Sequence, residues 1–200
     1  MGIYVTGNLK PGLQCTKAAS KAMSVLGLIK RRFGKVDKEC FKLLYKGYVR
    51  PHLEYCVQVW SPYLVKDIQC LEKVQRRATK MVRGLENMEY GDRLRILGLY
   101  SHEQRRLRGD LIEVYKILNG KEGLDRSEFF QFAPTVSTLR GHSLKLFMPR
   151  ARLHLRKYFF SHRVVSYWNR LPQHVVEAPS VNCFKARLDR HWKDMDVHKP

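Results

Sequence analysis

Cations are the side chains of this sequence whose type and spacing point most clearly to chemistry. Arg and Lys donate charge-assisted hydrogen bonds to phosphate oxygens, and a row of them along a helix can follow a nucleic-acid backbone. Two such clusters lie in the central part of the chain and supply the candidate nucleic-acid-binding residues. They are Lys73, Arg76, Arg77, Lys80 and Arg83 in the first cluster, and Arg105, Arg106 and Arg108 in the second.

The first cluster belongs to a helix predicted over residues 66–83. Apolar side chains from Ile68 to Val82 recur there at intervals of three and four, which is typical of a helix with one buried face. The cations fall close to the opposite face, where Asp67 and Glu72 are the acids that offset them. A solvated helix surface is the alternative. With Lys66, however, the predicted helix carries six cations against two acids, and this imbalance favours an anionic partner.

The second cluster opens a helix predicted over residues 101–118. Ser101 and Gln104 have the spacing of a capping box, which satisfies free N–H groups at a helix start. The three arginines stand in the first turns, where the helix dipole favours anions instead. Phosphate contact would explain this placement, and ion pairs with Glu103 and Asp110 would explain it equally.

The overall charge also indicates a polyanionic partner. The 200 residues contain 38 Lys and Arg against 18 Asp and Glu, which gives a net charge of +20 and a pI near 10.0. Each phosphate that a cation neutralises releases counterions, so the leading partner is RNA, DNA or an RNA–DNA hybrid, bound through its phosphate backbone. An anionic membrane surface is the weaker alternative.

Cysteine usage and hydropathy suggest the compartment. The five cysteines are odd in number and widely spaced, which predicts reduced thiols in a nuclear or cytoplasmic protein that is not secreted. No apolar run is long enough to span a membrane, and no signal peptide precedes the chain, so no membrane partner is expected. His52 and Cys56 lie one helical turn apart, but no second pair accompanies them. No metal and no cofactor are therefore predicted.

The sequence predicts no catalytic residue. It contains no P-loop, nucleophile elbow or HExxH motif. Nucleotidyl transfer needs clustered carboxylates that hold two metal ions, and the chain has neither an FxDD nor a YxDD motif. Asp92 in the string YGDR is a single aspartate where two would be needed. No small-molecule substrate is expected either.

The elements that must position these residues are mainly helices. Apolar periodicity predicts a helix over residues 15–33 and another from an Asp37 cap, interrupted at Pro51. Tyr and Trp side chains of this second helix would stack on bases if exposed, but their helical spacing is more typical of a core. They are Tyr45, Tyr48, Tyr55 and Trp60.

The flanking regions predict a few β elements. Residues 2–6 are typical of a short N-terminal strand, which would need a sheet to join. Residues 141–147 and 151–156 alternate at period two and predict a small β-hairpin. Two amphipathic helices follow, one over residues 160–171 and a last one capped by Ser180. The hairpin would carry a basic rim of Arg150, Arg152, Arg156 and Lys157.

Several long strings of this sequence resemble one family. They are LLYKGYVRPHLEYCVQVWSP, LEKVQRRATKMVRGL, YGDRLRILGLYSHEQRRLRGDLIEVYKILNG, RGHSLKLF, FFSHRVVSYWNRLP and APSVNCFKARLDRHW. Together they resemble the C-terminal part of reverse transcriptases from non-LTR retrotransposons, of the jockey and chicken-repeat type. The resemblance runs in the same order from one end of the chain to the other.

The resemblance implies a fold and a function. Residues 1–12 would be a remnant of the last palm strand and its turn, and residues 13–120 a helical thumb-like bundle that grips a template–primer duplex. Residues 121–200 would form a small α+β region. The fingers and the palm with its metal-binding aspartates are missing, so the chain is expected to be a truncated copy that is inactive alone as an RNA-directed DNA polymerase.

Two other interpretations remain open. The chain could serve a host as a protein-interaction module that makes contact through Phe129, Phe130 and Phe132 or through its C-terminal helix, with an unknown protein partner. It could also be a non-functional relic of a mobile element.

Overall fold

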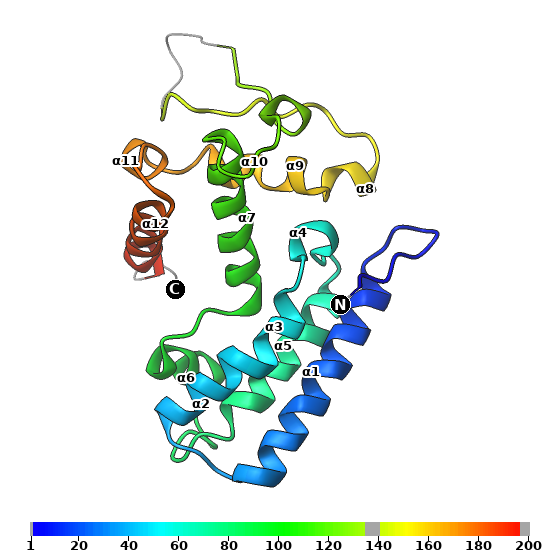
Figure 1. Cartoon of the computed structure of the whole chain (residues 1–200), viewed down its shortest axis with the longest axis vertical. Coiled ribbons are helices and arrows are strands. Elements are labelled where there is room, and N and C mark those ends of the chain that lie inside the picture. Colours follow the sequence, from blue (N-terminus) through cyan, green and yellow to red (C-terminus); the bar gives the residue numbers. More distant parts are fainter. Residues whose placement is uncertain (1, 135–140, 197–200) are drawn as a thin grey trace. The chain divides into compact units, whose positions relative to one another are not determined.

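The computed structural model describes residues 2–134 and 141–196, and this part of the chain is mainly helical, as predicted (Figure 1). The chain divides into two compact units, Met1–Arg106 and Leu107–Pro200. The division falls within helix α7 (His102–Leu118), whereas the sequence suggested one after residue 120.

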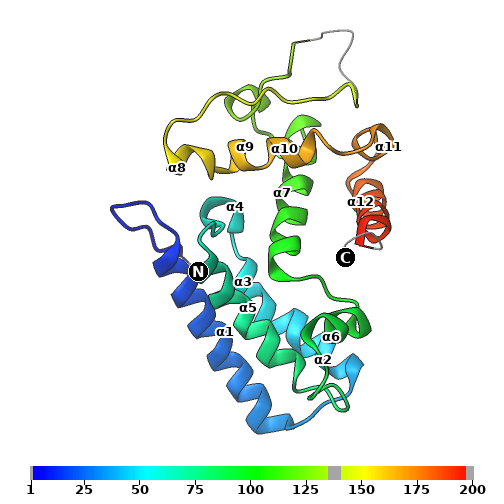
Figure 2. The ribbon, with the colours of Figure 1, turned by 180° about the vertical axis from the view of Figure 1, so that it is seen from behind.

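Two parallel helices form the framework of unit 1. Helix α1 (Gly12–Phe33) and helix α5 (Val65–Thr79) lie side by side and run in the same direction (Figures 1 and 2). At their start, the carboxylate of Asp67 lies next to Gly12. At the other end α1 stops at Gly34, whose φ of 63° suits a residue without a side chain and whose N–H donates to the carbonyl of Lys30 at 2.9 Å.

A broken helical run packs across this pair. Asp37 caps its start as predicted, because its Oδ1 accepts the N–H of Cys40 at 2.8 Å. The predicted interruption at Pro51 takes the form of a widened turn, in which the N–H of Arg50 donates to the carbonyl of Tyr45, five residues earlier. Proline has no N–H to donate and excludes a regular helix at this point. The run consists of α2 (Lys38–Leu44), η1 (Tyr45–Val49), α3 (Arg50–Glu54) and α4 (Val57–Trp60).

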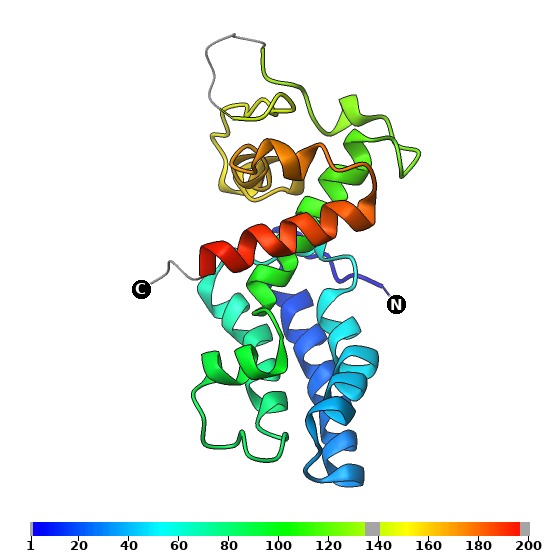
Figure 3. The ribbon, with the colours of Figure 1, turned by 90° about the vertical axis from the view of Figure 1, so that its left-hand side faces the viewer.

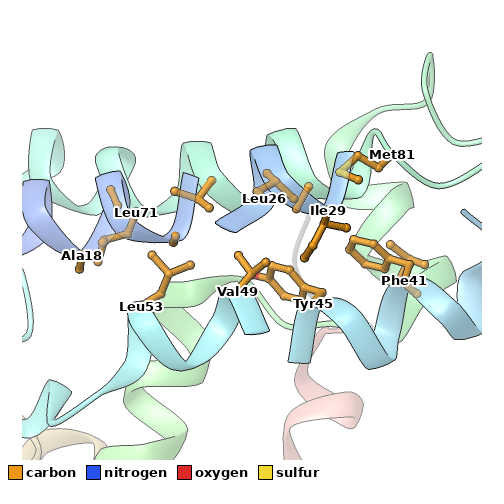
Figure 4. Close-up of a cluster of buried hydrophobic side chains, with 14 of the residues drawn as sticks. Ala18, Leu26, Ile29, Phe41, Tyr45, Val49, Leu53, Leu71 and Met81 are labelled. Carbon is orange, nitrogen blue, oxygen red and sulfur yellow. The ribbon is translucent and has the colours of Figure 1, made fainter. Parts of the chain in front are cut away.

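The core of unit 1 lies where α1, α5 and this run meet. Figure 4 shows Leu26 and Ile29 of α1 facing Tyr45 and Val49 of η1, with Leu71 of α5 farther along the same cluster, near Ala18. All six side chains are buried. Burial of each large apolar side chain stabilises the fold by about 1.5–3 kcal/mol, so this shared core fixes α5 against its neighbours.

Helix α5 ends four residues earlier than predicted. After Thr79 the chain leaves the helix, and Val82 forms an isolated parallel bridge with Val36. The N–H of Val36 donates to the carbonyl of Met81 at 3.1 Å, and the N–H of Arg83 donates to the carbonyl of Val36 at 3.0 Å. These backbone bonds replace the helical ones, so the prediction of a helix to residue 83 was wrong.

Two helices follow, and the second begins and ends largely as the sequence predicts. Helix α6 (Tyr90–Leu97) leads to α7, which starts with the predicted capping box. The N–H of Ser101 donates to Oε1 of Gln104, and the N–H of Gln104 donates to Oγ of Ser101, both at 3.2 Å. At the far end Gly120 has a φ of 63°.

Unit 2 is built on the rest of α7 and on helix α12 (Val181–Asp196), which crosses it at an angle (Figure 3). The ring of Tyr115 stacks on Phe184 with centroids 4.4 Å apart, and its hydroxyl donates to the carbonyl of Ala178. Ser180 caps α12 as predicted, because its Oγ accepts the N–H of Cys183 at 3.2 Å.

The remaining helices of unit 2 are short. The single helix predicted over residues 160–171 is two pieces separated at Val164. The short elements are η2 (Arg126–Glu128), α8 (His154–Lys157), α9 (Phe160–Arg163), α10 (Val165–Trp168) and α11 (Gln173–Val176).

The predicted β elements are not found among the described residues. Residues 2–6 are irregular, because no neighbouring backbone pairs with them, and the N–H of Tyr4 donates to the side chain of Gln14 instead. The hairpin prediction was also wrong. Leu146 forms a single antiparallel bridge with Phe132, and the expected second strand contains α8.

Side chains take the place of a partner strand around Leu146. The side chain of Asn169 both accepts from the N–H of Leu146 and donates to its carbonyl, each at 2.8 Å. The indole N–H of Trp168 donates to the carbonyl of Leu144 at 2.8 Å, and Gln173 accepts the N–H of Ser143 at 2.9 Å. The backbone here is satisfied without a hairpin.

Candidate nucleic-acid interface

The first cluster of predicted cations lies on the exposed side of α5 and in the turn that follows it. Lys73, Arg76 and Arg77 belong to the helix, and Lys80 and Arg83 follow its end. All five side chains are exposed. Within the described part of the chain, no ion pair neutralises any of them.

The acids expected to offset these cations point inward. Glu72 is buried and accepts hydrogen bonds from the hydroxyl of Tyr90 and from the N–H of His102, the latter at 3.0 Å. Asp67 is buried beside Gly12 at the start of α1, where the free N–H groups of a helix favour a negative charge. The exposed face of α5 is therefore more basic than the sequence count suggests.

A basic hollow lies at the end of unit 1 where α1 and α5 both terminate. It measures about 290 Å³ and brings together cations that are distant in the sequence. Of its cations, Lys35 forms an ion pair of 2.5 Å with Glu86. The lining consists of Lys30, Lys35, Arg77 and Lys80 together with Met23, Leu26, Gly27, Gly34 and Met81.

Lys30 and Lys35 are the candidate residues that sequence reasoning missed. The run from Lys30 to Arg32 is explained by the helix dipole alone, which favours cations at a helix end. Only the parallel packing of α1 on α5 shows that Lys30 lies beside Arg77 and Lys80. The Val36–Val82 bridge holds the two chain segments together at this point.

Arg76 lies on another side of the same helix. Its guanidinium group stacks over the ring of Tyr90, 4.2 Å from the centroid, in a shallow hollow that Lys73 and the acids Glu72 and Glu103 also line. A cation–π contact of this kind orients the guanidinium group but leaves its N–H groups available. Four cations of the first cluster therefore divide between two hollows: Arg77 and Lys80 line the basic hollow, and Lys73 and Arg76 line this second one, whereas Arg83 lines neither.

The buried side of α5 is held by a polar network centred on Gln75. Oε1 of Gln75 accepts the hydroxyl of Tyr45 at 2.6 Å, and its amide donates to the hydroxyl of Tyr90 at 3.0 Å and to the carbonyl of Tyr100 at 2.9 Å. Gln75 is fully buried, so each unmade bond would be costly. The network fixes the rotation of α5 and with it the direction of the exposed cations.

His102 completes this network as a neutral imidazole. Because the Tyr45 hydroxyl donates to Gln75, it accepts from Nε2 of His102, 3.0 Å away. Nδ1 is then the unprotonated nitrogen, and it lies 4.0 Å from Glu54. Burial, together with the smaller effects of the charges of Arg106, Arg105 and Arg50, lowers the pKa of His102 to about 3.

The second predicted cluster is engaged within the protein. Arg105 donates two hydrogen bonds to Glu54, and Arg108 donates two to Asp189, at 2.6 and 2.8 Å. Arg106 is buried. Ion pairs with Glu54 and Asp189 thus account for Arg105 and Arg108. Pairing of the cluster with Glu103 or Asp110 stays a prediction. Contact of these arginines with phosphate also stays a prediction.

The aromatic side chains divide between core and surface. Tyr45 and Trp60 are buried, whereas Tyr48 and Tyr55 are exposed. Among the three phenylalanines proposed as a protein contact, Phe130 packs edge-on against Phe160 with centroids 5.8 Å apart. The ring of Phe132 is partly exposed under the guanidinium group of Arg126.

The five cysteines are free thiols, and burial raises the pKa of Cys15 to about 12, which makes it a poor nucleophile. Within the described residues, no three His, Cys, Asp or Glu side chains are grouped so that they could hold a metal ion. In the same part of the chain, no helix has the length and apolar character needed to cross a membrane.

Comparison of the chain with models of known protein families, with curated protein sequences and with solved structures found no match.

Proposed function

We propose that this chain binds double-stranded nucleic acid through the phosphate backbone, using the basic hollow and the exposed face of α5. The observation that carries the proposal is the convergence of Lys30, Lys35, Arg77 and Lys80 where α1 and α5 end. The acids of α5, Asp67 and Glu72, are buried, and neither of them lines the basic hollow. Lys35 is paired with Glu86, but Lys30, Arg77 and Lys80 have no ion-pair partner in the described part of the chain. Uncompensated cations of this kind attract a polyanion and release its counterions.

The lining of the hollow favours backbone contact over base recognition. It contains no aromatic side chain on which an unpaired base could stack, and its polar groups are all cationic apart from the backbone. Lys73 and Lys80 are seven residues apart, which corresponds to about 10 Å along the helix and is enough to reach successive phosphates of one strand. We therefore infer binding that does not depend on sequence.

The same proposal gives a role to the family resemblance. A thumb that holds a template–primer duplex must grip backbone without reading bases, and a basic helix on a packed bundle suits that task. We propose that residues 13–120 act as such a thumb-like element of a non-LTR reverse transcriptase, with nucleic-acid binding as the activity of this chain alone. The catalytic carboxylates of a polymerase have no counterpart in its sequence.

Charge reversal in the basic hollow tests the proposal. The double variant Arg77→Glu/Lys80→Glu should weaken binding to a labelled 20-base-pair RNA–DNA hybrid by at least tenfold at constant salt. A matched control is Arg190→Glu/Lys193→Glu on α12, since both of these side chains are exposed and the net charge changes equally. Circular dichroism of both variants should match the unmodified chain.

Two outcomes would contradict the proposal. One is equal loss of affinity in the hollow variant and in the control, which would mean that only net charge matters. The other is unchanged affinity in the hollow variant. Either result would remove the end of unit 1 as the binding surface.

A further inference from the structure

A second basic surface lies in unit 2, and it is not part of the proposed duplex-binding surface. The sequence has no Asp or Glu between Glu128 and Glu177. Four cations within and just before helix α8 are exposed and have no ion-pair partner in the described part of the chain. They are Arg150, Arg152, Arg156 and Lys157.

Aromatic rings alternate with these cations around α8. The ring of Phe159 is 51% exposed, with the guanidinium group of Arg156 5.9 Å from its centroid. The rings of His154 and Tyr158 are nearly parallel, at 18°, with centroids 6.4 Å apart, and the ammonium of Lys157 lies 6.0 Å from the Tyr158 ring. The ring–cation cluster consists of these five residues: His154, Arg156, Lys157, Tyr158 and Phe159.

A buried ion pair anchors the cluster from behind. Arg163 donates two hydrogen bonds of 2.9 Å to Asp110 of α7, which is itself buried. The same guanidinium group donates to the carbonyl of Tyr158 at 3.2 Å. The backbone of the cluster is thereby held while the side chains of Arg156 and Phe159 stay at the surface. A surface ordered in advance loses less entropy when it binds a ligand.

We propose that the ring–cation cluster binds an unpaired strand of nucleic acid. Exposed rings offer stacking platforms for bases of any sequence, and the adjacent cations neutralise the phosphates of the same strand. The inference goes beyond the proposed function, because it concerns another surface and another form of nucleic acid. It stands whether or not the basic hollow binds a duplex.

An anionic membrane surface is the competing partner, because Leu153 is 71% exposed beside the cluster. Helices that lie on lipid present a long apolar face, usually over several turns. Helix α8 has only four residues, and its neighbours α9 and α10 bury Phe160, Val165 and Trp168 within unit 2. The interleaving of rings with cations therefore favours an unpaired strand.

The test measures binding of the full chain to fluorescent oligo(dT) of 20 nucleotides, which forms no duplex. The variant Arg156→Glu/Lys157→Glu should bind it at least tenfold more weakly, and Phe159→Ala about fivefold more weakly, because a stacking contact is lost. Affinity for the 20-base-pair hybrid should change less than threefold. Arg190→Glu/Lys193→Glu is the charge-matched control and should keep most of its affinity for oligo(dT).

A tryptophan variant guards against a folding artefact. Phe159→Trp retains a ring at the surface, so it should keep its affinity for oligo(dT), and its emission should be quenched when the oligonucleotide binds. The Arg77→Glu/Lys80→Glu variant should keep its affinity for oligo(dT) but lose affinity for the RNA–DNA hybrid. That result would show that the two surfaces bind independently.

The inference is overturned if Phe159→Ala binds oligo(dT) as tightly as the unmodified chain, or if the control loses as much affinity as Arg156→Glu/Lys157→Glu. It is also overturned if the chain binds phosphatidylserine vesicles but not oligo(dT) and, in addition, Leu153→Ala abolishes the binding to vesicles. That last result would assign the surface to a membrane.

Discussion

Arg105 donates two hydrogen bonds to the carboxylate of Glu54, with N–O distances of 2.7 and 3.0 Å. The pair joins the first turns of α7 to the end of α3, and both side chains are largely shielded from water. An arginine that the sequence marks as a phosphate ligand therefore has a structural partner within the fold.

This geometry predicts that Arg105 stabilises unit 1 more than it binds nucleic acid. Arg105→Ala should lower the free energy of unfolding by about 1–3 kcal/mol, the usual range for hydrogen bonds to charged groups. Glu54→Ala should have a similar effect, and the double variant should lose less than the sum. Urea unfolding measures all three, and strict additivity would show that the pair contributes nothing.

The Gln75 network predicts a large effect of a near-isosteric change. Gln75→Leu keeps the volume but leaves the Tyr45 hydroxyl and the Tyr100 carbonyl without their partner. The free energy of unfolding should fall by about 2–4 kcal/mol, because buried polar groups lose their hydrogen bonds. Arg77→Ala on the exposed side of the same helix should change it by less than about 0.5 kcal/mol. Equal effects would contradict the burial of Gln75.

His102 predicts an acid-dependent loss of stability. The pKa of His102 is lowered to about 3 in the folded chain, whereas an unfolded histidine titrates near pH 6.5. Between these values only the unfolded chain binds the proton, so the free energy of unfolding falls as pH falls from about 6.5 toward 3. In the variant His102→Gln, the number of protons taken up on unfolding should fall by up to one. The slope of the unfolding free energy against pH, measured by urea unfolding between pH 4 and 7, reports this number. Identical slopes for the two proteins would refute the neutral, buried assignment.

Asp37 gives a smaller and more local prediction. Its side chain accepts the N–H of Cys40 at the start of α2, so Asp37→Ala should lower the free energy of unfolding by about 1 kcal/mol. Asp37→Asn and Asp37→Ser should restore most of the loss, since both side chains can accept the same bond. Thermal unfolding followed by circular dichroism compares the three, and no rescue would argue against a capping role.

Local signals in the sequence were sufficient for the existence of the main helices and for three of their starts. Asp37, Ser101 and Ser180 act where their capping chemistry predicts, because a cap involves residues only two to four positions apart. The β predictions failed because a strand needs a distant partner. The backbone around Leu146 finds its hydrogen bonds on the side chain of Asn169, which no periodicity reveals.

The candidate site was predictable only in part for the same reason. Periodicity alone placed Lys73 and Arg77 outside and Val74 inside, and the structure agrees. It could not show that Glu72 is turned inward to Tyr90, or that Lys30 of α1 lies beside Lys80. Both facts depend on how helices pack together.

The most direct test of the account is the salt dependence of duplex binding. Log K for a 20-base-pair RNA–DNA hybrid should fall linearly with log salt concentration, with a slope of about −0.9 for each phosphate neutralised. The variant Lys30→Ala/Arg77→Ala/Lys80→Ala should reduce the magnitude of that slope by about 2 to 3. A slope unchanged from that of the unmodified chain would mean that these cations touch no phosphate and would contradict the account.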